Sequence, residues 1–148
     1  MQWWDTVCIF FVQLRFIGDV LFFYSLGDFI IANENIPYAP EDMYEMYHMK
    51  SDALMRDVFK KRSGDFRRGL QKDRRAFETI VPCWTVKNGV LQQITLLPLE
   101  LGFEEHRSMN GLTKPMKNAT FMEKLQDMSR KYGTEIVMRK DDLGEIVL

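Results

Sequence analysis

Residues 76–101, AFETIVPCWTVKNGVLQQITLLPLEL, contain the strongest local signal in the sequence. Two apolar, β-branched runs, 76–86 and 90–101, lie on either side of the tripeptide Lys-Asn-Gly at 87–89. Asn-Gly readily adopts the positive φ angles of a type I′ turn, the turn that joins two antiparallel strands in a tight hairpin. The stretch therefore predicts a β-hairpin.

Each run of this hairpin contains one proline, Pro82 in the first and Pro98 in the second. Proline has no N–H to donate to a neighbouring strand, so both are expected at a sheet edge or a bulge. Residues 134–138 and 145–148 predict two further short strands at the end of the chain.

A helix is expected between the hairpin and these last strands. Thr120 and Glu123 match a capping box, in which the two side chains satisfy backbone donors at the start of a helix. Gly133 supplies the left-handed residue that ends such a helix. The apolar residues that recur three and four apart, and so predict its buried face, are Phe121, Leu125, Met128 and Tyr132.

Two short helices and a basic stretch are expected upstream of the hairpin. Proline and carboxylates at 40–42 suit the first turn of one helix, and the Ser-Asp pair at 51–52 is expected to cap the second. Its inward residues would be Ala53, Leu54, Met55 and Val58. Residues 60–75 carry eight basic side chains. Because Asp65 and Asp73 interrupt them, a solvated loop and helix end is favoured over a polyanion-binding patch.

The start of the chain contains two apolar runs, 6–14 and 20–27, with Arg15 and Asp19 between them. A membrane-spanning helix needs about 20 uninterrupted apolar residues, and a signal peptide needs a basic start, which MQWWD lacks. Both runs therefore predict buried β-strands. Two buried strands that open a chain need neighbours, so a missing N-terminal portion or a protein partner is expected.

Composition fits one globular domain of 148 residues, with a net charge of −1 that gives no electrostatic case for nucleic acid or an anionic membrane. Cys8 and Cys83 lie in no Cys-x-x-Cys or Cys/His spacing, so a zinc site is unsupported. Two buried free thiols are favoured over a disulfide between them.

Catalytic residues cannot be assigned from the pattern of side chains. The only histidines are His48, expected on a helix, and His106, which follows Glu104 and Glu105 in a loop. Adjacent residues point apart and seldom chelate together, so solvated loop charges are favoured over a metal site. Neither Gly-x-Ser-x-Gly nor a Gly-rich loop followed by Lys-Ser/Thr occurs. No catalytic residue and no metal ligand is therefore predicted.

Five segments resemble, in the same order, motifs of one protein family. Residues 23–29 (FYSLGDF) resemble a Tyr-Ser-Leu-Gly-Asn-Phe signature, and residues 39–44 (APEDMY) an acidic helix with a tyrosine. Residues 97–103 (LPLELGF) resemble a strand end, and residues 107–115 (RSMNGLTKP) an Arg-Ser-x-x-Gly loop followed by proline. Residues 129–134 (SRKYGT) resemble the close of a last helix. Over residues 18–148 the chain is thus similar to the C-terminal region of the CapA family of capsule-synthesis (poly-γ-glutamate) proteins.

The resemblance implies an α/β fold, namely the C-terminal portion of a calcineurin-like metallophosphatase (an α/β/β/α sandwich) that is incomplete. It describes residues 1–148 as one partial domain, in which residues 1–17 are a divergent N-terminal segment. Complete family members bind a divalent metal through upstream motifs, among them Gly-His-x-Pro-His. Residues 1–17 stand in that place and contain no histidine. No cofactor is therefore expected in this chain.

Three substrate-pocket candidates follow from the resemblance alone: Ser25, Asp28 and Arg107. Asp28 stands where the signature has asparagine. This replacement exchanges an amide, which donates as well as accepts hydrogen bonds, for a carboxylate that only accepts when ionised.

The expected function is that of a CapA-like protein related to capsule or poly-γ-glutamate synthesis, truncated or divergent, without a metal-dependent active site. One alternative is part of a metal-dependent hydrolase whose upstream motifs are missing. Another is a non-catalytic interaction module that adds a partner's strand to an exposed sheet edge. Family members are commonly associated with the cell envelope, but this sequence assigns no compartment.

Overall fold

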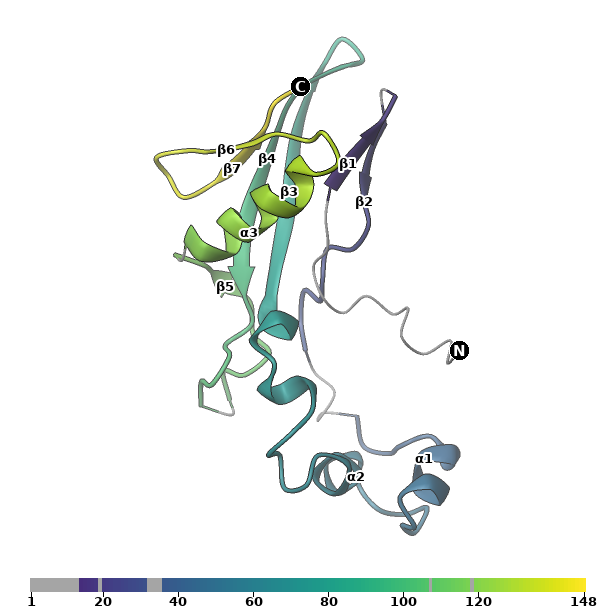
Figure 1. Cartoon of the computed structure of the whole chain (residues 1–148). Helices are drawn as coiled ribbons and strands as arrows, with labels where there is room; N and C mark the ends of the chain where they lie inside the picture. Colours follow the sequence, from purple (N-terminus) through teal and green to yellow (C-terminus); the bar gives the residue numbers. More distant parts are fainter. Residues whose placement is uncertain (1–13, 19, 32–35, 107, 118) are drawn as a thin grey trace.

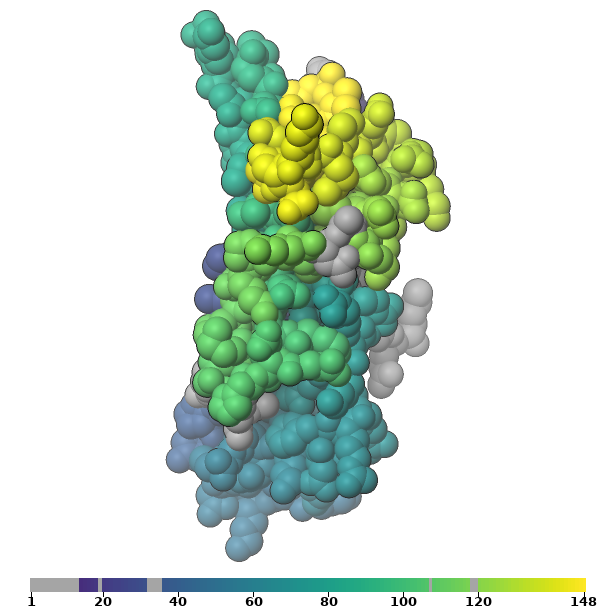
Figure 2. All heavy atoms as spheres, turned by 90° about the vertical axis from the view of Figure 1, so that its left-hand side faces the viewer, coloured from purple at the N-terminus to yellow at the C-terminus, as the bar shows by residue number. Residues whose placement is uncertain are grey.

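The computed structural model describes residues 14–18, 20–31, 36–106, 108–117 and 119–148, in which helices accompany antiparallel sheets, so the fold is α/β in the broad sense. The molecule is elongated, with the tip of a long hairpin at one end and two short helices at the other (Figures 1 and 2). The elements are β1 (Leu14–Ile17), β2 (Val20–Phe23), α1 (Glu41–Met46), α2 (Met55–Arg62), η3 (Leu70–Lys72), η4 (Arg74–Phe77), β3 (Glu78–Lys87), β4 (Val90–Glu100), β5 (Lys114–Pro115), α3 (Ala119–Arg130), β6 (Ile136–Met138) and β7 (Gly144–Ile146).

The long hairpin is β3 and β4, as the Asn-Gly turn predicts. Asn88 and Gly89 have φ angles of 53° and 77°, the left-handed values that a type I′ turn requires. The register shifts between Thr85 and Val86, where β4 carries one extra residue. The terminal strands β6 and β7 are also present and continue the sheet in the order β3-β4-β7-β6, with β5 paired to β4.

The two prolines of the hairpin have different settings. Pro82 lies on β3, an edge strand, as expected. The expectation for Pro98 is wrong, because β4 is a central strand. Pro98 lies between the part of β4 that pairs with β7, which ends at Leu96, and the part that pairs with β5, which begins at Leu99. The change of partner at this point leaves room for a residue without an N–H.

The core lies on one face of the five-stranded sheet, where α3 and the β1–β2 hairpin cover it (Figure 1). α3 buries Phe121 and Leu125 as predicted, together with Met122 and Ser129, which the predicted face omitted. Tyr132 is half-exposed instead of buried, because the helix ends at Arg130. The buried core residues of this cluster are Leu14, Ile80, Ile94, Leu96, Met116, Phe121, Met122, Leu125, Ile136 and Ile146.

The ends of α3 agree only in part with the expected caps. Thr120 lies inside the helix, because α3 begins at Ala119, so the expectation that Thr120 is the cap residue is wrong. Gly133 has the expected left-handed conformation, with a φ of 79°.

The β1–β2 hairpin is half-buried, so the expectation of a fully buried strand over residues 20–27 is wrong. Only one of its faces packs on the core, and Val20 and Phe22 on the other face are 56% and 44% exposed. Successive residues of a strand point to opposite sides, so a hairpin covered on one side shows alternating burial. Of the predicted strand at 6–14, only Leu14 lies within the described residues, and it is fully buried.

Both predicted short helices are present, but the second begins differently. α1 follows Pro40, as the sequence predicts. Leu54 precedes α2 without a side-chain cap, and the N–H of Met55 donates to the carbonyl of Pro37 at 3.0 Å. The expected cap at 51–52 is therefore wrong, and so is the inward position of Leu54, which is 43% exposed. Its bridge to Tyr38 holds the chain extended up to the first helical residue.

Two further expectations for single residues are wrong. Cys83 is exposed, because it lies in the half of β3 next to the turn, where every residue from Cys83 to Lys87 is exposed; Cys8 lies outside the described residues. His48 follows α1 in a turn with a φ of 51° and is not part of a helix.

None of the helices in the described ranges has the length and apolar character needed to cross a membrane.

Candidate functional site

The segment that carries Ser25 and Asp28 is an irregular strap, residues 24–31, held at three points. The Thr79 hydroxyl donates to the Leu26 carbonyl, and the Thr113 hydroxyl donates to the Phe29 carbonyl. The N–H of Ile31 donates to the carbonyl of Gly111 at 3.1 Å. The strap is therefore fixed to β3 and to the loop after β4 by groups far from it in sequence.

The three substrate-pocket candidates are placed only in part. Ser25 and Asp28 both lie in the strap, half-buried. The Ser25 hydroxyl accepts a bond from the N–H of Gly27 at 3.3 Å. Partial burial raises the pKa of Asp28, and no described cation forms an ion pair with it. Arg107 lies outside the described residues.

Two glycines allow close backbone contacts at the loop after β4, Gly102 within the loop and Gly111 against the strap. Gly102 and Gly111 have φ angles of 63° and 85°. A β-carbon at either position would overlap a backbone oxygen, that of Met109 for Gly102 and that of Ile31 for Gly111. The N–H of Gly111 also donates to the carbonyl of Leu101 at 2.7 Å. These contacts explain why glycine is needed at both positions.

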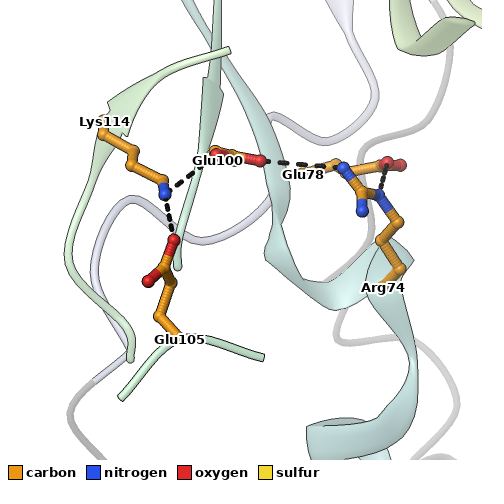
Figure 3. Close-up of polar contacts among 5 residues, drawn as sticks. All are labelled: Arg74, Glu78, Glu100, Glu105 and Lys114. Atoms are coloured by element: carbon orange, nitrogen blue, oxygen red, sulfur yellow. Dashed lines mark hydrogen bonds and ion pairs between the residues drawn. The ribbon is translucent and has the colours of Figure 1, made fainter. Parts of the chain in front are cut away.

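Five charged side chains form a continuous network at the base of the hairpin, here called the charge chain (Figure 3). Arg74 Nε lies 3.2 Å from Glu78 Oε1, and Arg74 Nη2 lies 3.7 Å from Glu100 Oε2. Lys114 Nζ lies 3.2 Å from Glu100 Oε1 and 2.6 Å from Glu105 Oε1. Basic and acidic groups thus alternate from η4 to the loop after β4.

Burial within the charge chain is uneven. The Glu78 side chain is 9% exposed and that of Glu100 25%, whereas the side chains of Arg74, Glu105 and Lys114 are 40–48% exposed. Arg74 lies 5.9 Å from the ring centroid of Phe103. The two inner carboxylates therefore depend on cations that reach them from the surface, since a buried charge without a partner is costly.

The outer pair of the charge chain is unsuited to acid–base catalysis near neutral pH. Its hydrogen bond to Lys114 lowers the pKa of Glu105. Hydrogen bonds to Glu105 and Glu100 raise the pKa of Lys114. Both groups stay charged at pH 7, so neither is a general acid or base there, nor is Lys114 a nucleophilic amine. The arrangement is suited to positioning or binding.

One feature of the sequence indicates this network. Glu78 and Glu100 are directly opposite each other in the hairpin, and like charges at such positions destabilise a sheet unless a cation is shared. Arg74 is four residues before Glu78 and meets that need. The bulge after Thr85 shifts the register by one residue, however, so counting from the turn alone would not have paired the two glutamates.

The resemblance expects a divalent metal in complete family members, held by upstream motifs, and no cofactor in this chain. In the described part of the chain, no three His, Cys, Asp or Glu side chains gather where they could hold a metal ion. His106 Nδ1 lies 2.9 Å from the Ser108 hydroxyl in an exposed loop, and Glu105 pairs with Lys114 as a solvated loop charge.

The basic stretch at 60–75 is largely exposed, and several of its cations are paired locally. Lys60 Nζ lies 3.6 Å from Asp65, and Arg75 Nη2 lies 2.6 Å from Asp73. This pattern agrees with a solvated loop and helix end.

No protein-family model and no curated protein sequence matches the chain.

Proposed function

We propose that the chain is a CapA-like protein related to capsule or poly-γ-glutamate synthesis, and that these 148 residues act by binding, without a metal of their own. Its fold would then be the C-terminal part of a calcineurin-like metallophosphatase domain. The support for the family is the order of five sequence segments.

One structural observation carries the proposal further: three of those segments contact one another. The strap, residues 24–31, overlaps the first segment, residues 23–29. The Phe29 carbonyl accepts a hydrogen bond from the Thr113 hydroxyl, and the N–H of Ile31 donates one to the Gly111 carbonyl. Gly111 is in turn bonded to Leu101 at the end of β4. The first of these segments lies about 70 to 90 residues before the other two, and the contacts at Gly102 and Gly111 leave no room for a β-carbon.

The chemistry of the described residues favours binding over hydrolysis. Glu105 and Lys114 are held in their charged forms, and the two histidines are not joined by other metal ligands in the described ranges. Asp28 is the one carboxyl group of the strap, and it stands without a cation among the described residues. Its negative charge would repel an acidic polymer, since like charges at close range oppose binding.

The proposal is tested by isothermal calorimetry of the full chain with poly-γ-glutamate at low ionic strength. We expect saturable binding that becomes tighter in Asp28→Asn, because the substitution removes a negative charge from the strap. Asp52→Asn, on an exposed turn between α1 and α2, serves as the matched control and should bind like the unchanged chain. Absence of binding by both the unchanged chain and Asp28→Asn would contradict the proposal.

A second candidate, an interaction module, is supported by the position of β3 at an edge of the sheet that the described residues form. β3 is an edge strand, and its residues from Cys83 onward are exposed, among them Trp84 at 60% and Val86 at 55%. An exposed edge strand of this kind is a template for a partner's strand. Size-exclusion chromatography combined with thermal unfolding tests this candidate, since a cooperative, stable monomer would argue against the need for a partner.

A further inference from the structure

Glu100 divides its two carboxylate oxygens between cations that come from different parts of the chain. Oε2 lies 3.7 Å from Arg74 Nη2, and Oε1 lies 3.2 Å from Lys114 Nζ. Arg74 belongs to η4, before the hairpin, and Lys114 to β5, after it. In Figure 3 Glu100 lies between the other members of the network.

Each cation holds a separate segment. Arg74 belongs to the η4 arm, residues 73–77, in which the N–H of Ala76 donates to the carbonyl of Asp73 at 3.0 Å. Lys114 binds Glu105 in the loop arm, residues 102–113, in which the N–H of Glu105 donates to the carbonyl of Gly102 at 3.2 Å. Within the described residues, Lys114 has no ion pair or hydrogen bond with the η4 arm.

We propose that Glu100 couples these two arms, so that loosening one loosens the other, and that the coupling is sensitive to ionic strength. Glu100 is three-quarters buried, but its partners Arg74 and Lys114 are 48% and 40% exposed, so dissolved salt can screen both pairs. If its charge is removed, Arg74 and Lys114 lose their shared anion and repel each other. Ion pairs joined in a network contribute more to stability than isolated surface pairs do. The inference does not depend on the proposed function.

Hydrogen exchange of the full chain, followed at single amides, tests the coupling. The amide of Ala76 reports the η4 arm and the amide of Glu105 the loop arm. We expect Glu100→Gln to speed exchange at both amides by roughly threefold, the effect of losing a modest ion pair. Glu105→Gln should speed exchange most at Glu105, and by a smaller factor at Ala76, because it loosens Lys114, which also pairs with Glu100. Asp127→Asn breaks an exposed pair of 3.7 Å on α3 and should change neither amide.

Lys114→Gln is the second test and does not require Glu100 to be altered. Among the described residues Lys114 forms no ion pair or hydrogen bond with the η4 arm, so faster exchange at Ala76 in this variant would indicate that Glu100 transmits the effect. In the unchanged chain, salt at about 1 M reduces the screening length to about 3 Å. Hydrogen exchange at the Ala76 and Glu105 amides should then become faster together. If Glu100→Gln changes one arm or neither, or if Lys114→Gln leaves Ala76 unchanged, the coupling is refuted.

Discussion

Gly111 and Ile31 are in direct backbone contact, although 80 residues separate them. The N–H of Ile31 donates to the carbonyl of Gly111 at 3.1 Å, and a β-carbon at position 111 would overlap the carbonyl oxygen of Ile31. This contact joins the strap to the loop after β4. A substitution at Gly111 therefore tests directly whether the two segments are packed together.

Gly111→Ala should destabilise the protein by about 2–4 kcal/mol, since it adds a left-handed alanine and a steric overlap with backbone. Gly133→Ala is the matched control. Gly133 has a similar φ of 79°, but its β-carbon would meet nothing within 4 Å. This control should cost about 1 kcal/mol. Equal losses in the free energy of unfolding for the two variants, measured with urea, would show that the strap does not pack closely against position 111.

Thr79→Val should destabilise the protein by about 1 kcal/mol and speed amide exchange in the strap. The substitution preserves shape but leaves the Leu26 carbonyl without its hydroxyl donor. Thr85→Val on the exposed part of the same strand is the control and should be nearly neutral. Urea unfolding and amide exchange measure the two effects. If amide exchange in the strap is unchanged in Thr79→Val, the Thr79 hydroxyl does not hold the strap in place.

Asp28→Asn should stabilise the protein at pH 7 and have less effect in acid. Burial raises the pKa of Asp28, so the folded state binds this proton more tightly than the unfolded state. The resulting stabilisation is complete below the ordinary pKa of 3.8 and is lost as the pH rises through the raised pKa. The urea midpoint of Asp28→Asn should therefore exceed that of the unchanged chain more at pH 7 than below pH 3.8. A gap that widens in acid would contradict this account.

Glu105→Gln should have the opposite pH dependence. Lys114 lowers the pKa of Glu105, so the contribution of the carboxylate is complete above the ordinary pKa of 4.5 and is lost as the pH falls through the lowered pKa. The unchanged chain should be more stable than Glu105→Gln at pH 7, and the difference should close in acid. Glu123→Gln, on an exposed position of α3, controls for the loss of one acidic group. A difference that persists in acid would assign another role to Glu105.

Local signals in the sequence predicted the elements whose causes are local. The Asn-Gly turn led to β3 and β4, and Gly133 led to the end of α3, because both depend on backbone conformations that few residues adopt. The position of Pro98 was not predictable in the same way. It depends on β4 exchanging one partner strand for another, which is a property of the assembled sheet.

The candidate site was predictable only for residues within the resembling motifs. Ser25 and Asp28 came from the signature, and the structure places both in the strap. Thr79 was not identified, because a threonine on a strand gives no local sign that its hydroxyl meets a carbonyl 53 residues away. Glu100 was missed for a related reason, since its two cations are 26 and 14 residues distant and the register depends on a bulge.

The central claim, that these 148 residues act without a metal of their own, is tested most directly by calorimetric titration of the full chain with Mn²⁺ and with Zn²⁺. The account predicts no heat beyond that of dilution up to about 1 mM metal, a concentration that corresponds to a binding free energy of only about −4 kcal/mol. Stoichiometric binding of either ion well below that concentration would contradict it.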